Sequence, residues 1–156
     1  MLQTCVRENV HPAHTFFKRM CDYQHPVLLN KLQAELGITR DEARILFEDV
    51  KQFLALCVST PQPLVPTKAL DRGWHVFILF TKDYMQFCKD YCGRYVHHQP
   101  EDPFAEVKDY KSVLRTRELA ELVFGSLSSN WLSKDVKTCQ GKECSENDCT
   151  TCKGAP

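Results

Sequence analysis

The stretch that decides the fold is "DRGWHVFILFTKDYMQFCKDYCGRYVHH", residues 71–98. Its apolar and aromatic side chains recur every three or four positions, the spacing that places side chains on one face of a helix. Thr67 before it and Thr81 within it are residue types that favour a helix N-cap. The stretch therefore predicts two consecutive helices, over 68–80 and 82–91. The first has so few polar side chains that we expect it to be the central helix.

Helical spacing also continues on both sides of this stretch. Thr39 and Glu42 form a capping box, which predicts the start of a helix over 40–58. Prolines between Pro61 and Pro66 end that helix, because proline lacks an amide hydrogen and disfavours helical backbone before it. Three further helices are expected, two of them followed by a glycine suited to a helix end: 12–22, 26–36 before Gly37, and 104–124 before Gly125.

No segment alternates apolar and polar residues as a strand would. The sequence therefore predicts an all-α fold, a compact bundle of five to six helices over residues 1–132. From residue 133 to residue 156 the composition changes to polar residues and cysteine, with almost no apolar side chain to bury. We expect this second part to be a Cys-rich tail.

Charge and composition exclude several partners. Lys and Arg together number 20, as do Asp and Glu, so no basic excess is present to attract nucleic acid, and we do not expect a nucleic-acid partner. No segment approaches about 20 consecutive apolar residues, and the N-terminus lacks a secretion signal. These features predict a cytoplasmic protein without a membrane partner. Nine cysteines in a reducing compartment are more typical of metal ligands than of disulfides.

Side chains suited to zinc gather within the quoted stretch. Two of them lie four positions apart on the first helix, a third lies on the second helix, and two follow the bend after it. Imidazole nitrogen and thiolate sulfur are ligands that zinc favours, and a carboxylate can complete the set. The sequence predicts that these five residues meet at one buried centre: Asp71, His75, Cys88, His97 and His98.

A plainer interpretation of the same residues stays open. In it, His75 is a core histidine hydrogen-bonded to Asp71, and the paired histidines cap a helix end. Cys88 and Cys92 are then small buried apolar side chains. Nearer the N-terminus, several metal-ligand residue types fall on weakly periodic chain and are interpreted as surface and cap residues: His11, His14, Cys21 and His25.

The tail carries a second candidate zinc site. Its four cysteines have the spacing C-x4-C-x4-C-x2-C: Cys139, Cys144, Cys149 and Cys152. Four thiolates this close can enclose one tetrahedral zinc ion, and the binding would supply folding energy that the tail cannot obtain from an apolar core. Disulfides formed on oxidation and free thiols are the alternatives.

Residues about 60–132 resemble the glycine-rich domain-containing protein family, in its short stand-alone bacterial or phage type. Three segments carry the resemblance: Pro66-x4-Asp71-x2-Trp74-His75, Thr81-x2-Tyr84-x2-Phe87-Cys88 and Gly93-Arg94-x2-His97-His98-x-Pro100, with Tyr110-x12-Val123-Phe124-Gly125-x5-Trp131 as a closing segment. The resemblance implies an all-helical domain whose Asp, Trp, His and Cys pack around a common centre. The chain departs from the family in lacking both its glycine-rich region and a second histidine after the Trp-His pair.

Three functions are compatible with the sequence. The first is a small helical interaction or adaptor protein with a buried Asp-His-Cys centre, polar or metal-linked, a zinc-binding tail and a protein partner. The second is a metal- or thiol-dependent enzyme that uses Asp71, His75, Cys88 and His98 in a cleft. The third is a bacterial or phage regulator or inhibitor that acts by protein contact.

Overall fold

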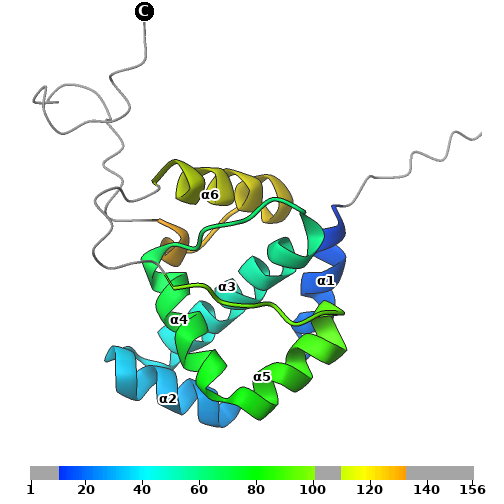
Figure 1. Ribbon diagram of the computed structural model, residues 1–156. Coiled ribbons are helices and arrows are strands. Elements are labelled where there is room, and N and C mark those ends of the chain that lie inside the picture. Colours follow the sequence, from blue (N-terminus) through cyan, green and yellow to red (C-terminus); the bar gives the residue numbers. More distant parts are fainter. Residues whose placement is uncertain (1–10, 101–109, 133–156) are drawn as a thin grey trace, which may run out of the picture.

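The computed structural model describes residues 11–100 and 110–132. In these ranges the chain forms helices and connecting loops and contains no strand, so the predicted all-α fold is confirmed (Figure 1). Six α-helices, one π-helix and one short 3-10 helix follow in this order: α1 Pro12–Met20, α2 Pro26–Leu36, α3 Arg40–Ser59, α4 Lys68–Leu79, α5 Thr81–Phe87, η1 Cys88–Cys92, α6 Tyr110–Phe124 and η2 Ser129–Trp131. The predicted tail, 133–156, lies outside the described residues.

Most helix boundaries follow from local chemistry. The predicted capping box is present, since the Thr39 hydroxyl accepts from the Glu42 amide and the Glu42 carboxylate accepts from the Thr39 amide. Thr67 caps α4 as expected. Gly37 has φ +65°, a backbone conformation that costs glycine little, and it ends α2.

Two boundaries differ from the prediction. Thr81 is the first residue of α5 and not its cap, because Phe80 occupies the N-cap position, without a side-chain hydrogen bond. The helix expected over 82–91 changes to a π-helix at Cys88. Of the helix expected over 104–124, the structure describes the part from Tyr110 onward.

The central helix is α3, and not α4 as predicted. In Figure 1 α3 runs through the middle of the molecule, and it packs against α1, α2, α4 and α6. Gly73 of α4 makes a close approach possible, because a Cβ at this position would lie 3.0 Å from Cγ of Leu46 on α3. One side of α4 therefore faces the core through Trp74 and Phe77, while its other side, with His75, faces solvent.

Candidate metal centre

Among the described residues, one group of His, Cys, Asp or Glu side chains has its ligand atoms close enough together for a metal ion. It consists of Asp71, His75 and His98, whose ligand atoms lie within 4.8 Å of one another. We call this group the Asp71 cluster. Helix α4 supplies Asp71 and His75 one turn apart, and the loop after η1 brings in His98. Oδ1 of Asp71 lies 2.7 Å from Nε2 of His98, and Oδ2 lies 3.2 Å from Nδ1 of His75.

Hydrogen bonding determines which ring nitrogens carry protons. Nδ1 of His75 lies 2.8 Å from the backbone oxygen of Asp71, which can only accept. Nδ1 therefore carries the proton in the metal-free protein, and Nε2 carries the lone pair. Nε2 of His98 donates in the same way to the Asp71 carboxylate, so this carboxylate orients both rings. The planes of the two imidazoles are tilted by 57°, with centroids 4.1 Å apart.

The Asp71 cluster lies at the surface and not in the interior, which corrects the expectation of a buried centre. The side chain of His98 is 8% exposed, that of Asp71 37% and that of His75 49%. The reason is the orientation of α4, whose Asp71 and His75 point away from α3. A metal ion held here would keep a coordination position accessible to solvent.

The enclosed side of the cluster is formed by Trp74. Its ring packs edge-on against His98 with centroids 4.5 Å apart, and its Nε1 donates to the Tyr84 hydroxyl at 3.0 Å. That hydroxyl donates to the backbone oxygen of Val96 at 2.6 Å, two residues before His98. Trp74, Tyr84 and Val96 are all buried.

Cys88 does not join the Asp71 cluster, so the structure divides the predicted Asp-His-Cys centre in two. Cys88 and Cys92 are buried on η1 and interact with each other. Hydrogen bonds from the Cys92 thiol and from the Val96 amide lower the pKa of Cys88 to about 6, against the effect of burial. The Cys92 hydrogen bond is the largest of these causes. The Tyr84 hydroxyl also lies near Cys88, but its proton is donated to the Val96 oxygen.

The remaining predicted site residues lie elsewhere. His97 is exposed, with its ring 4.7 Å from that of Tyr95. His11 and His25 are N-caps of α1 and α2, as the cap interpretation predicted. The tail cysteines lie outside the described residues, so their zinc site stays a prediction: Cys139, Cys144, Cys149 and Cys152.

Two buried charged residues on α3 were missed by the sequence reasoning. Lys51 is fully buried and donates to the backbone oxygens of Met20 at 3.1 Å and Tyr23 at 3.3 Å. It also forms an ion pair with Glu48 at 2.7 Å. The sequence held a signal, because Lys51 falls four positions after Phe47 on the apolar stripe of this helix.

Asp49 is the second missed residue, and it ties the last described segment to the core. Its carboxylate accepts from the Ser128 hydroxyl at 2.6 Å, the Asn130 amide at 2.7 Å and Nε1 of Trp131 at 3.2 Å. Burial raises the pKa of Asp49, and these three hydrogen bonds oppose the shift. Asp49 also falls on the apolar stripe, three positions after Leu46.

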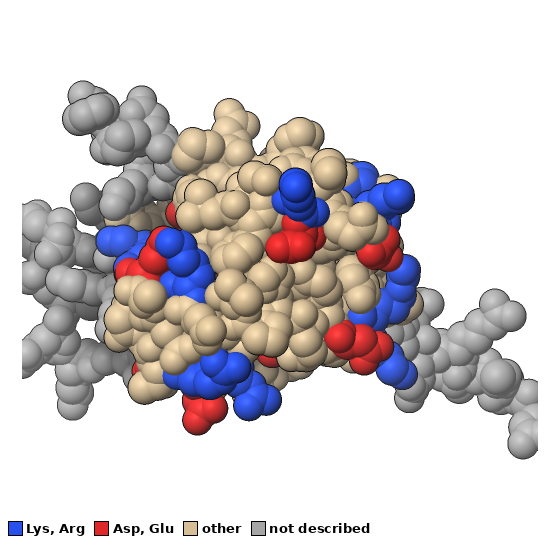
Figure 2. All heavy atoms as spheres, turned by 90° about the horizontal axis from the view of Figure 1, so that it is seen from below, with Lys and Arg blue, Asp and Glu red and all other residues tan. Residues whose placement is uncertain are grey.

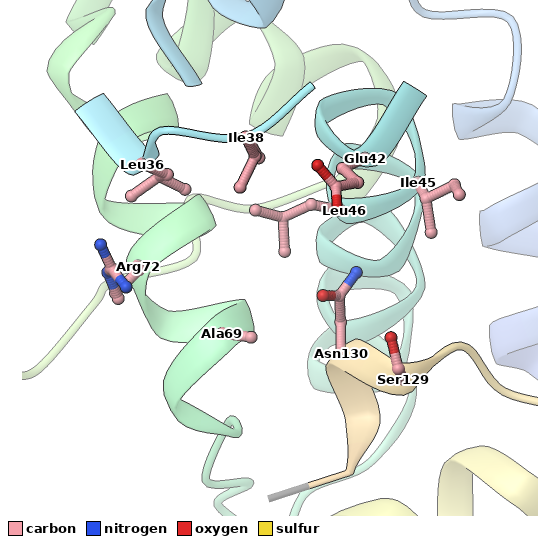
Figure 3. A pocket seen from close by; sticks show the side chains of 9 residues that line it. All are labelled: Leu36, Ile38, Glu42, Ile45, Leu46, Ala69, Arg72, Ser129 and Asn130. Carbon is pink, nitrogen blue, oxygen red and sulfur yellow. The ribbon is translucent and has the colours of Figure 1, made fainter. Parts of the chain in front are cut away.

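A separate pocket of about 200 Å³ lies between α3 and α4 (Figure 3). In Figure 3 the side chains of Leu36 and Ile38 lie at the upper end and Leu46 lies between the helices, with Arg72 on the α4 side and Asn130 at the lower end. The lining residues are Leu36, Ile38, Glu42, Ile45, Leu46, Ala69, Arg72, Ser129 and Asn130. None of them belongs to the Asp71 cluster, so the pocket and the candidate metal centre are distinct places on α4.

Comparison with known proteins identifies a family without a described activity. The family model that matches is UCP032817-like, and it covers residues 17–120, about two thirds of the chain. This match shows that the resemblance to glycine-rich domain-containing proteins was wrong, and no other comparison supports that resemblance. Of the residues that carried that resemblance, Trp74, Tyr84, Phe87 and Cys88 lie in the core. No curated protein and no solved structure matches the chain.

Proposed function

The chain belongs to the UCP032817-like family, an uncharacterised family, and we propose from its own geometry that it is a zinc-binding helical interaction protein. In this proposal Asp71, His75 and His98 hold one zinc ion. The observation that carries it is the convergence of three donor atoms within 4.8 Å from two segments far apart in sequence.

The donor set fits zinc in kind and in spacing. Two imidazoles and one carboxylate are common zinc ligands, with bonds of about 2.0–2.2 Å. Ligand atoms of a tetrahedral site with such bonds are about 3.3 Å apart. The N–O separations of 2.7 Å and 3.2 Å in the Asp71 cluster are near that value, while atoms up to 4.8 Å apart would approach by side-chain rotation. On binding, the proton on Nδ1 of His75 and the proton on Nε2 of His98 would move to the other nitrogen of each ring, and the hydrogen bonds to Asp71 would be exchanged for metal bonds.

Zinc binding can be measured by calorimetry on the full chain, with the tail cysteines replaced so that they do not contribute. The tail-serine variant carries four substitutions together: Cys139→Ser, Cys144→Ser, Cys149→Ser and Cys152→Ser. We expect it to bind one zinc ion, and we expect the additional change His98→Ala to abolish that binding. His97→Ala is the matched control, because His97 adjoins His98 but lies outside the cluster. Equal binding by all three proteins would refute the assignment.

The interaction part of the proposal is supported by exposed apolar side chains. Val27 on α2, Leu79 at the end of α4 and Met85 on α5 are 61%, 63% and 59% exposed. Figure 2 shows the molecule from below, and residues other than Lys, Arg, Asp and Glu cover most of this face, while most of the charged side chains lie toward its edge. Such surfaces are typical of protein contacts, whether the chain acts as an adaptor or as a bacterial or phage regulator.

Retention of a protein from the source cells tests this part. A partner held by the wild-type chain should be lost with Leu79→Lys and Met85→Lys and kept with Leu122→Lys, whose side chain on α6 is 82% exposed. Loss with all three variants, or with none, would contradict a contact through α4 and α5.

A reducing compartment such as the cytoplasm suits the proposal, because the cysteines among the described residues are free thiols. No helix among those residues has the length and apolar character to span a membrane.

A metal-dependent enzyme is the second candidate, and the exposure of His75 favours it. When three protein side chains hold zinc, the open position takes a water whose pKa falls to about 7, which makes it a nucleophile at neutral pH. Asp71, His75 and His98 would hold the ion, while Cys88 is too buried to take part. Hydrolysis of activated carboxylic and phosphate esters by zinc-loaded protein, and its loss in His98→Ala, would favour this candidate. No turnover above free zinc would exclude it for these substrates.

A further inference from the structure

We propose that Trp74 and Tyr84 are positioning residues that hold His98 in the Asp71 cluster and thereby set its affinity for zinc. This inference rests on the proposed zinc site. It concerns how the site is built, because neither residue is a ligand.

The backbone around His98 has no regular structure to fix it. Residues 95–100 belong to no helix, so the hydrogen bonds of a helix do not place the imidazole. His98 nevertheless lies 2.7 Å from Asp71, which is on another element. Contacts from neighbouring elements, α4 and α5 among them, must therefore hold the loop in place.

Two contacts from these helices meet at this loop. The Tyr84 hydroxyl donates to the Val96 oxygen at 2.6 Å and so fixes the backbone two residues before His98. The Trp74 ring lies against the His98 ring at a centroid distance of 4.5 Å and limits its rotation. Nε1 of Trp74 donates to the same Tyr84 hydroxyl at 3.0 Å, so the two contacts act together.

The arrangement also places the candidate ligands and their support on the same helix. Trp74 immediately precedes His75 and follows Asp71 by three positions in α4, yet its side chain is buried while theirs are half-exposed. One helix thus presents two ligands outward and one support inward. Such outer contacts fix the orientation of a ligating histidine, and their loss typically costs roughly 10- to 100-fold in metal affinity.

Tyr84→Phe is the sharpest test, because it removes the hydroxyl and keeps the ring in the core. The Val96 oxygen and Nε1 of Trp74 then lose a partner, and the loop that carries His98 is released. We expect zinc affinity of the tail-serine variant to fall roughly 10- to 100-fold. Trp74→Phe removes the Nε1 donor and leaves a smaller ring beside His98. We expect it to lower the zinc affinity of the tail-serine variant by a similar factor.

Tyr23→Phe is the matched control. Tyr23 also belongs to the aromatic core, but its ring contacts lie with His25, Phe47, Phe77, Phe87 and Tyr91 and not with the Asp71 cluster. We expect zinc affinity within about twofold of the parent, since none of these contacts involves His98 or the loop that carries it. If Tyr84→Phe and Tyr23→Phe bind zinc with equal affinity, the positioning role is refuted.

A metal-free measurement separates this inference from the zinc proposal. With histidine labelled by ¹⁵N, the ring signals of His98, identified by their absence in His98→Ala, report its hydrogen bond to Asp71. We expect these ring signals of His98 to shift in Tyr84→Phe and Trp74→Phe and to keep the parent's chemical shifts in Tyr23→Phe. Absence of zinc binding in the parent, combined with these shifts, would refute the metal site and support the positioning role. Unchanged His98 signals in folded Tyr84→Phe would refute the positioning role, regardless of whether the protein binds zinc.

Discussion

Nε2 of His98 lies 2.7 Å from Oδ1 of Asp71, although the two residues are 27 positions apart. This contact joins the loop after η1 to the solvent-facing side of α4. It turns a helical pair, Asp71 and His75, into a group of three donors.

His75→Ala should leave the metal-free protein folded while it weakens zinc binding. The side chain is 49% exposed and its loss opens no cavity in the core, so thermal unfolding of the metal-free variant should match that of the parent. Zinc affinity should fall by more than about 100-fold, since loss of a direct ligand costs more than loss of an outer contact. A strongly lowered melting temperature without metal would instead indicate a structural role for His75.

Lys51→Met should destabilise the fold. Methionine keeps most of the volume but removes the donor, so the partly buried Tyr23 oxygen loses the Lys51 donor, while the Met20 oxygen keeps the Tyr23 amide. An unsatisfied buried acceptor costs about 1–3 kcal/mol of the free energy of unfolding, and we expect a loss toward the lower end because this oxygen is partly exposed. Urea denaturation measures this change. The control is Lys31→Met, which alters an exposed pair with Glu35 on α2 and should cost under about 1 kcal/mol.

Asp49→Ala should release the segment that contains η2. The Ser128 hydroxyl, the Asn130 amide and Nε1 of Trp131 all lose their acceptor. Because Trp131 is 1% exposed, its unpaired donor alone costs about 1–3 kcal/mol of unfolding free energy. Urea denaturation gives the total loss. A red shift of tryptophan fluorescence should accompany it, and an unchanged spectrum with unchanged stability would contradict this role of Asp49.

Tyr23 should make the fold sensitive to alkali. Burial, with the charges of Asp83 and Tyr91 as smaller causes, raises the pKa of Tyr23 to about 12 from the ordinary value of 10.0. A pKa raised in the folded state stabilises the fold fully below pH 10, and this contribution is lost as the pH rises through about 12. Stability of the parent should therefore fall more steeply than that of Tyr23→Phe between pH 10 and 12. Parallel curves of unfolding free energy against pH for the two proteins would show that Tyr23 titrates as in the unfolded chain.

The fold could be predicted because its signals are local. Helical spacing, the capping box at Thr39 and the glycines at positions 37 and 125 each depend on a few neighbouring residues, and the structure agrees with them. The shift from α5 to a π-helix at Cys88 was missed, because no local signal distinguishes it from a continuing α-helix. The central position of α3 was also missed, since it depends on how the helices pack.

The candidate site could be predicted only in part. The four-residue step from Asp71 to His75 placed both on one face, but helical spacing alone did not show that this face is turned to solvent. His98 and Cys88 looked equally suitable by residue type, and only the path of the loop through Val96 brings one to Asp71 and not the other. Composition cannot give this path, because it depends on contacts made across the fold by Tyr84 and Trp74.

X-ray absorption at the zinc edge of the loaded tail-serine variant tests the central claim most directly, because it reports which atoms surround the ion. We predict a shell of nitrogen and oxygen at about 2.0–2.1 Å, with the outer scattering of two imidazoles and no sulfur. This is the signature of Asp71, His75 and His98. A sulfur shell at about 2.3 Å, or a protein that retains no zinc, would contradict the account.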